Sequence, residues 1–293
     1  MPLPTIPSGN VASATASTGY EVANSCMFHD GDSAYLTRNL GTSTAGSGKK
    51  FTFSAWVKRA TLGTTQYLFS SSVSTHQAYL SFESDNTLRF RLIYGGTTYG
   101  DLITNAVFRD PTAWLHIIVN MDTTQSTDTN RTKMYVNGSQ VTNFSTSTRP
   151  NQDSTFTVNN NTVNNQELSF GRDENGDGSY FDGYMTEVAW IDGTAYAASN
   201  FGEYDEDSPQ IWKPKDFKDD VTFGTHGVYL DFEDSGDLDD DESGNGNDFT
   251  ATNLAATDQS IDTCTINYPI LNSVVQNFGS NNDRFLEGAL KYY

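Results

Sequence analysis

Residues 51–58 read Phe-Thr-Phe-Ser-Ala-Trp-Val-Lys, and this octapeptide decides the fold class. The alternate positions are Phe51, Phe53, Ala55 and Val57 on one side and Thr52, Ser54, Trp56 and Lys58 on the other. A period of two places successive side chains on opposite faces of an extended chain. The stretch therefore predicts a β-strand with two distinct faces.

Similar strands flank this octapeptide along the chain. Residues 88–94 repeat the alternation, and residues 114–121 are nearly continuous in apolar side chains, as in a central strand covered on both faces. The pair Asn137-Gly138 predicts a tight hairpin turn. Helical periodicity is confined to one turn near residues 195–201. The chain is therefore predicted to be all-β, an antiparallel two-sheet β-sandwich.

The predicted organisation has three parts. Residues 1–20 are small, polar and marked by proline, residues 21–268 hold the sandwich with an acidic loop at 233–248, and residues 269–293 form a C-terminal tail of unpredicted structure. A segment without a core of its own needs outside contacts to offset about 1–2 kcal/mol of backbone entropy per ordered residue. We expect residues 1–20 to be an N-terminal anchoring arm; the alternative is an arm that lies on its own domain.

The charge balance limits the partners. The chain has 17 Lys+Arg against 37 Asp+Glu, a formal net charge of −20. A polyanion would be repelled, so nucleic acid and anionic membranes are not expected partners. No apolar run reaches the ~18–20 residues of a membrane span, and the start lacks the pattern of a secretory signal. We expect a soluble chain without such a signal.

Three segments resemble the concanavalin A-like lectin/glucanase superfamily, in particular laminin-G-like and pentraxin-like domains. They are residues 51–60, residues 114–122 with 133–141, and residues 168–203. In the third segment Phe181-Asp182-Gly183-Tyr184, Glu187 and a helical turn at 195–201 follow each other in the order found in that family. The resemblance implies a concanavalin A-like jelly roll.

A second resemblance concerns the segments that flank the sandwich. Residues 7–38 and 229–263 look like parts of virion proteins of tailed bacteriophages. This resemblance implies a non-enzymatic structural protein of the virion, of the capsid decoration, head-fibre or tail-fibre type, attached through its arm to other virion proteins. A symmetric homo-oligomer is expected in that setting. The alternative is a lectin-like adhesin that binds a host-surface glycan, with or without calcium.

Calcium is the candidate cofactor. Asp173, Asn175 and Asp177 fit the pattern D-x-N-x-D-G, the first half of an EF-hand loop, but Tyr184 stands where the bidentate Glu belongs. A complete EF-hand is excluded, and the choice lies between a calcium site and a solvated acidic turn. The acidic residues between positions 231 and 242 form a second cluster. This cluster could bind a cation, and the alternative is a solvated loop whose charges repel one another. Cysteine and histidine spacings give no zinc motif.

No set of catalytic residues is expected. Glucanases of this superfamily carry the motif E-x-D-x-E on one strand. The most similar stretch here, residues 203–207, has Asp in place of the last Glu and lies just before Pro209, which indicates a loop. No G-x-S-x-G and no complete phosphate-binding loop occur. His116 lies in an apolar strand and is interpreted as a packed histidine. The chain is therefore predicted not to be an enzyme.

Two further pairs of residues are candidates. Tyr180 and Trp190 could stack on sugar rings, or pack against a sheet. Cys26 and Cys264 lie near the two ends of the sandwich, so a disulfide is conceivable, although assembly in a reducing cytoplasm argues against one.

Overall fold

The structure, a computed structural model, describes residues 19–40, 46–156, 158, 166–175 and 178–268, together with 285–286 and 291–292. Within these ranges the regular elements are β-strands and short 3-10 turns, without an α-helix. The predicted all-β class is confirmed, and the helical turn expected near 195–201 is the 3-10 turn Ala198–Asn200. No helix long and apolar enough to span a bilayer is found in the described ranges.

The first sheet has eight strands, all antiparallel to their neighbours. Its order is β10 (Ser139–Gln140), β9 (Thr132–Val136), β8 (Leu115–Asp122), β3 (Lys50–Arg59), β13 (Gly183–Asp192), β1 (Ser25–Phe28) and β18 (Gln259–Ser260), with β16 (Val228–Leu230) also paired to β13. The octapeptide 51–58 lies in β3, at the centre of the sheet. The predicted hairpin joins β9 to β10, where Asn137 and Gly138 take φ of 47° and 74°.

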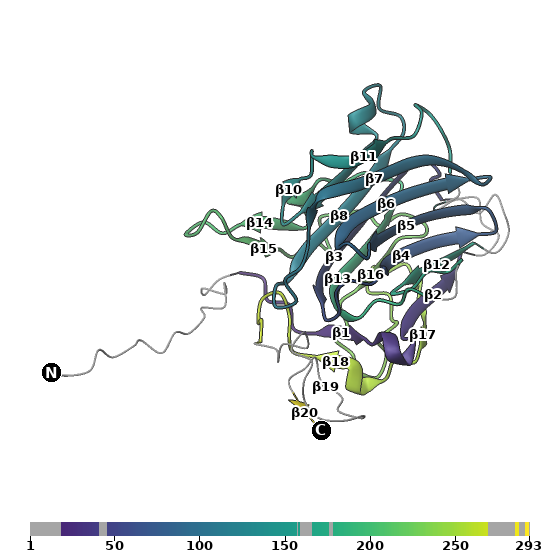
Figure 1. Cartoon of the computed structure of the whole chain (residues 1–293). Helices are drawn as coiled ribbons and strands as arrows, with labels where there is room; N and C mark the ends of the chain where they lie inside the picture. Colours follow the sequence, from purple (N-terminus) through teal and green to yellow (C-terminus); the bar gives the residue numbers. More distant parts are fainter. Residues whose placement is uncertain are drawn as a thin grey trace.

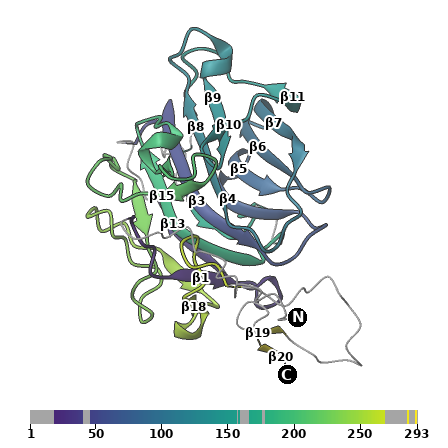
Figure 2. The ribbon, with the colours of Figure 1, turned by 90° about the vertical axis from the view of Figure 1, so that its left-hand side faces the viewer.

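The second sheet also has eight strands. Its order is β11 (Phe144–Thr148), β7 (Thr97–Val107), β6 (Thr87–Tyr94), β5 (His76–Phe82), β4 (Gln66–Val73), β12 (Glu167–Phe170), β2 (Tyr35–Asn39) and β17 (Thr250–Thr252). Figures 1 and 2 show the two sheets as facing layers. Aromatic rings fill the space between them: Trp190 of β13 stacks on Phe51 at 5.1 Å and lies 5.0 Å from Phe69 of the opposite sheet.

The outer face of the first sheet is covered by later parts of the chain. Ile118 and Ile191 of that sheet pack with Phe201, Phe217 and Phe223 in a second apolar cluster. The two-stranded sheet of β14 (Gly202–Tyr204) and β15 (Trp212–Pro214) lies on the same side, away from the second sheet (Figure 2). Apolar packing therefore closes this face.

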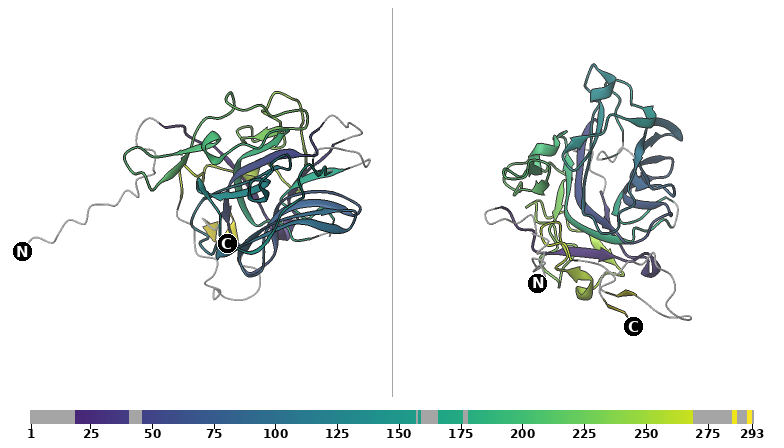
Figure 3. Two further views of the ribbon diagram at one scale, coloured as in Figure 1. Left: turned by 90° about the horizontal axis from the view of Figure 1, so that it is seen from above. Right: turned by 60° about the vertical axis from the view of Figure 1, so that its left-hand side comes forward.

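The two segments that flank the sandwich meet at one edge of the molecule. β1 pairs with β18, and β2 pairs with β17, so residues 25–39 lie beside residues 250–260 (Figures 1 and 3). Side chains add to this pairing, because Ser25 Oγ donates to the Asp262 carbonyl at 2.6 Å and Val22 N donates to Thr265 Oγ1 at 3.1 Å. Residues 1–18 of the predicted arm and most of the predicted tail lie outside the described residues, which include only β19 (Phe285–Leu286) and β20 (Lys291–Tyr292) of that tail.

Candidate functional site

The outer face of the second sheet is polar, and we call it the polar face. Strand alternation creates it: Phe69, Leu80 and Phe90 point into the core, and the residues between them point outward. One cross-strand row of outward residues runs Ser70, Tyr79, Arg91 and Asp101. The alternation predicted for residues 88–94 therefore places its apolar side chains in the core and its arginines on the polar face.

Hydrogen bonds and ion pairs hold the side chains of the polar face in place. Arg89 donates from Nε and Nη2 to the two carboxylate oxygens of Asp101, at 2.8 and 2.7 Å. The rings of Tyr67 and Tyr79 lie 4.8 Å apart, and both tyrosines are at least nine-tenths buried. This part of the face is pre-organised by its own contacts.

The loop between β12 and β13 lies against the polar face. Gln77 Nε2 donates to Asp173 Oδ1 at 2.9 Å, Ser70 Oγ donates to the Arg172 carbonyl at 3.1 Å, and Glu174 N donates to Ser70 Oγ at 2.9 Å. The loop thus forms a wall across the outer side of β4 and β5.

Two half-buried tyrosines stand at this wall. Tyr35 of β2 and Tyr180 of the loop stack with ring centroids 6.3 Å apart and an interplanar angle of 29°. The Arg172 guanidinium lies 3.7 Å from the centroid of the Tyr35 ring and pairs with Glu174. Aromatic faces beside charged hydrogen-bonding groups are a common platform for sugar rings.

Glu167 and Glu174 form a carboxyl pair beside this platform. Their carboxyl groups hydrogen-bond to each other, and this contact, with burial and the charge of Glu174, raises the pKa of Glu167 to about 7, against the opposing effect of Arg172. Two carboxylates in contact cannot both carry charge cheaply, so the pair shares a proton near neutral pH. Sequence reasoning missed the pair because the loop folds back across the sheet.

The predicted calcium loop is part of the same wall. Asp173 is half-buried, and its Oδ1 also accepts from Asn175 N at 3.0 Å. Burial raises the pKa of the Asp173 carboxyl. Asp177, the third predicted ligand, lies outside the described residues, so calcium binding by Asp173, Asn175 and Asp177 stays a prediction.

Trp190, one of the two candidates for stacking on a sugar ring, is a core residue. Its side chain is fully buried between the sheets, because β13 turns this position inward. The alternative interpretation, packing against a sheet, is therefore the correct one. Tyr180 remains partly exposed and keeps its candidacy as a stacking residue.

A disulfide between Cys26 and Cys264, conceivable from the sequence, is absent, since both are free thiols. Cys26 points into the core between the sheets, whereas Cys264 packs with Trp56, Trp114 and Tyr184 on the opposite face of the first sheet. The terminal segments are neighbours, as expected, but Cys26 on β1 faces the core, whereas Cys264, in the chain that follows β18, packs on the other side of the sheet.

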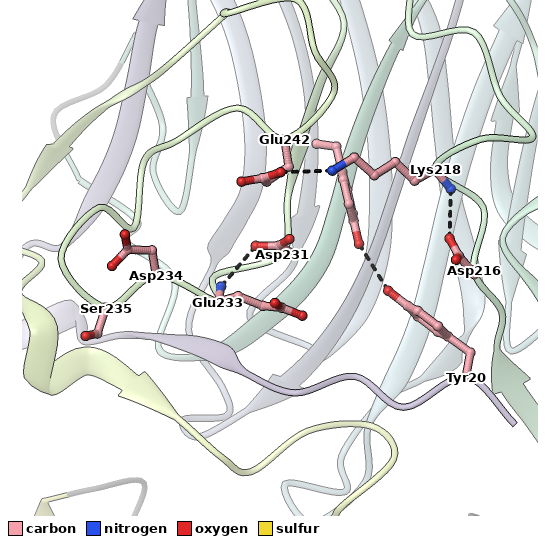
Figure 4. Close-up of a pocket in the computed structure, with 9 residues that line it drawn as sticks. Tyr20, Asp216, Lys218, Asp231, Glu233, Asp234, Ser235 and Glu242 are labelled. Carbon is pink, nitrogen blue, oxygen red and sulfur yellow. Dashed lines mark hydrogen bonds and ion pairs between the residues drawn. The ribbon is translucent and has the colours of Figure 1, made fainter. Parts of the chain in front are cut away.

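An acidic pocket of about 610 Å³ lies on the covered side of the molecule (Figure 4). It is lined by Tyr20, Asp216, Lys218, Tyr229, Asp231, Glu233, Asp234, Ser235 and Glu242. Lys218 Nζ donates to Glu242 at 2.9 Å, and the hydroxyls of Tyr20 and Tyr229 lie 3.3 Å apart. This pocket gathers side chains from the start of the described chain and from the acidic region.

Glu187 is buried beside the two tyrosines of this pocket. It has φ of 51° at a bulge in β13, and its carboxyl accepts from Tyr20 Oη at 3.2 Å and from Tyr229 Oη at 3.0 Å. Burial raises the pKa of Glu187 to about 8, against the lowering effect of the two hydroxyls. The carboxyl is therefore protonated at neutral pH. The sequence showed a Glu on the strand but gave no signal for the bulge.

The acidic loop folds around some of its own carboxylates. Asp241 is 7% exposed and accepts from Tyr229 N at 3.0 Å and from Asn247 N at 2.8 Å. Asp239 Oδ2 accepts from Ala251 N at 2.8 Å. A fully solvated, self-repelling loop was therefore the wrong interpretation for these two residues.

The residues weighed as catalytic fit structural roles. Glu203 lies on β14, away from the polar face, and pairs with Lys213 at 3.4 Å. His116 is buried between Trp56 and Trp212, and Trp212 Nε1 donates to its Nδ1 at 2.8 Å, so its Nε2 carries the proton shared with Ser54 Oγ. Burial lowers the pKa of His116 to about 3. The prediction of a packed histidine is confirmed.

A two-sheet jelly roll with one closed face and one polar face defines a lectin-like sandwich protein. The sequence matches a laminin G family model of the concanavalin A-like lectin/glucanases superfamily over residues 30–198, more than half of the chain. The chain belongs to this superfamily. A search of curated proteins gave no match.

Solved structures with a similar fold have low sequence identity. A putative carbohydrate binding protein from Bacteroides ovatus is 14% identical, with a TM-score of 0.49 over 80% of this chain and 60% of that one. A pentraxin from Limulus polyphemus is 15% identical, with a TM-score of 0.40 over 59% of this chain and 78% of that one. Domains LG4-5 of the mouse laminin alpha1 chain are 14% identical, with a TM-score of 0.39 over 61% of this chain and 44% of that one.

Proposed function

We propose that this chain is a non-enzymatic glycan-binding protein that holds its ligand on the polar face. The carrying observation is the stacked pair Tyr35 and Tyr180, half-buried on a face that no apolar cluster of the described residues closes. A sugar ring presents C–H groups to an aromatic face and hydroxyls to its rim. Tyr180 supplies the aromatic face, while Arg172 and Glu174 supply donors and acceptors beside it.

The carboxyl pair on this face does not suit glycoside hydrolysis. Glycosidases keep their two carboxyl groups about 5–9.5 Å apart, so that a glycosidic oxygen or a water fits between them. Glu167 and Glu174 are instead in direct hydrogen-bond contact and are bridged by Arg172. Such a pair leaves no room for a glycosidic oxygen or a water between its carboxyl groups.

A glycan array probed with the full chain, in calcium and in EDTA, tests the proposal. We expect the wild type to bind at least one glycan, Tyr180→Ala to lose that binding, and Tyr204→Ala to keep it. Tyr204 is the matched control because it is 44% exposed and lies on β14, away from the polar face. The absence of binding in both buffers, or equal binding by Tyr180→Ala, would refute the role of this face.

We also propose that the protein is part of a bacteriophage virion, attached through residues 1–18 to other virion proteins. Two observations support this second function. Residues 7–38 and 229–263 resemble parts of phage virion proteins, and the described portions of these two segments lie side by side in β1, β2, β17 and β18. The resemblance thus falls on one edge of the molecule.

Deletion of residues 1–18 tests the attachment. The deletion keeps Tyr20 and its bond to Glu187, so the sandwich itself is preserved. We expect the shortened chain to fold, by circular dichroism and thermal melting, and to be missing from purified particles assembled in its presence. Particles that contain the shortened chain at wild-type copy number would contradict attachment by the arm. Native mass spectrometry of the free protein tests the expected homo-oligomer.

A further inference from the structure

We infer that His29, Asp30 and Asp182 form a binding site for a divalent first-row transition-metal ion such as Zn²⁺ or Mn²⁺. One ligand atom from each residue lies within 4.8 Å of the other two. Ligand distances in such sites are about 2.0–2.2 Å, so a small inward movement of the three side chains would close them around one ion. The inference is independent of glycan binding.

Strand register brings the three residues together. β1 ends at Phe28, which is the register partner of Gly183 at the start of β13. His29 and Asp30 follow the end of β1, and Asp182 directly precedes β13, so the ligands flank one antiparallel pair. His29 and Asp182 are 153 positions apart, and motif spacing along the sequence therefore gave no zinc signal.

Charge at the cluster favours a cation. Asp182 is 8% exposed and receives a hydrogen bond from Thr61 Oγ1. Asp30 lies against it, and within the described ranges neither aspartate forms an ion pair with Lys or Arg. Two adjacent carboxylates, one of them largely removed from water, repel each other, and an ion of charge +2 would remove that repulsion.

The imidazole is pre-positioned for this role. His29 Nδ1 lies 3.1 Å from Asp32 Oδ2, the carboxylate–histidine contact that orients metal-binding imidazoles. The His29 ring packs against Gly31, where an added Cβ would lie 2.8 Å from His29 Cε1. One nitrogen and two carboxylate ligands favour Zn²⁺ or Mn²⁺ over Ca²⁺, which prefers oxygen ligands throughout.

Isothermal titration of the untagged full chain with Zn²⁺, after removal of metals with EDTA, tests the site. We expect one ion per chain, an affinity for Zn²⁺ above that for Ca²⁺, and an affinity lowered about tenfold or more in His29→Ala. His76→Ala is the matched control, because His76 is also partly exposed and lies on β5 in the other sheet. Its affinity should equal that of the wild type.

Two further measurements keep the test decisive. Asp30 is exposed, so Asp30→Asn should fold normally and still weaken Zn²⁺ binding if the site is real. Cobalt(II) bound to the wild type should give a visible absorption band that His29→Ala lacks. The inference is overturned if the wild type takes up no Zn²⁺, if His29→Ala and Asp30→Asn bind it as tightly as the wild type, or if Ca²⁺ binds as tightly as Zn²⁺.

Discussion

At the scale of single residues, Glu187 combines two energetically unfavourable features, a strained backbone conformation and a buried carboxyl group. Its backbone has positive φ, which costs about 1–3 kcal/mol in a residue other than glycine, and its carboxyl is buried. The hydroxyls of Tyr20 and Tyr229 hydrogen-bond to this buried carboxyl. The packing and hydrogen bonds around Glu187 maintain this conformation. Its hydrogen bond with Tyr20 connects the start of the described chain to β13.

The pKa of Glu187 makes the stability of the protein fall as pH rises. The ordinary carboxyl pKa is 4.5 and the folded-state pKa is about 8, so between these values the unfolded chain releases a proton that the folded chain keeps. We expect Glu187→Gln to gain stability relative to the wild type across this window, by up to about 5 kcal/mol. Urea unfolding at pH 5, 6, 7 and 8 measures the difference, with Glu203→Gln as an exposed control. Parallel pH curves for wild type and Glu187→Gln would disprove the burial effect.

At the scale of elements, the segment from β18 to Tyr268 is fastened to the first sheet by a buried ion pair. Lys58 Nζ lies 2.7 Å from Asp262 Oδ2, and both side chains are 1% exposed. Lys58 also donates to Asn267 Oδ1 at 2.8 Å, and Trp114 Nε1 donates to Asp262 Oδ1 at 3.2 Å. The pair therefore connects β3 to the segment that follows β18, the edge strand next to β1.

Removal of one partner of this pair leaves a buried charge without compensation. We expect Lys58→Met or Asp262→Asn to lower the free energy of unfolding by about 3–5 kcal/mol, and the double variant to lose less than the sum. Urea unfolding of the four proteins gives the coupling energy, and hydrogen exchange should show faster exchange at residues 259–268 in each single variant. Additive losses would mean that the two side chains do not interact.

Local pattern predicted the strands but not their lateral order. Residues 51–58 and 114–121 gave their strand type and faces directly, since a period of two is a local property. The pairing of β1 with β13 and β18 depends on residues more than 150 positions apart, which no local pattern reports. Tyr180 was a candidate from the sequence, whereas Tyr35, which stacks on it from β2, and Glu167 of β12 were not.

At the scale of the whole molecule, the two cysteines lie on opposite faces of the first sheet, so the reactivity of each thiol measures how well its face is packed. Cys26 belongs to the core between the sheets and Cys264 to the cluster around Trp56 and Trp114. Burial raises the pKa of both thiols, which leaves little reactive thiolate.

We expect native protein to react slowly with a thiol reagent and urea-unfolded protein to react at two thiols per chain. The mobility of denatured, thiol-blocked protein should be the same on reducing and non-reducing gels. Fewer than two reactive thiols after unfolding without reductant would indicate a covalent bridge and contradict the structure.

The net charge of −20 is distributed over groups with different tasks. Asp241 organises a loop, Asp262 fastens a segment and Glu187 stays protonated, so part of the acidic content is structural. Composition gives the net charge, but it cannot assign carboxylates to these tasks, because their roles depend on burial.

The position of β1 has a mechanical consequence. β1 pairs with β13 on one edge and β18 on the other, and the described chain leaves it toward Gly19. If the arm is the point of attachment, a pull on the rest of the molecule loads β1 along its own axis. Hydrogen bonds on both edges then carry the force in shear and must rupture together, whereas a peripheral hairpin would unzip one bond at a time. The strand nearest the tether is thus the one placed to resist tension.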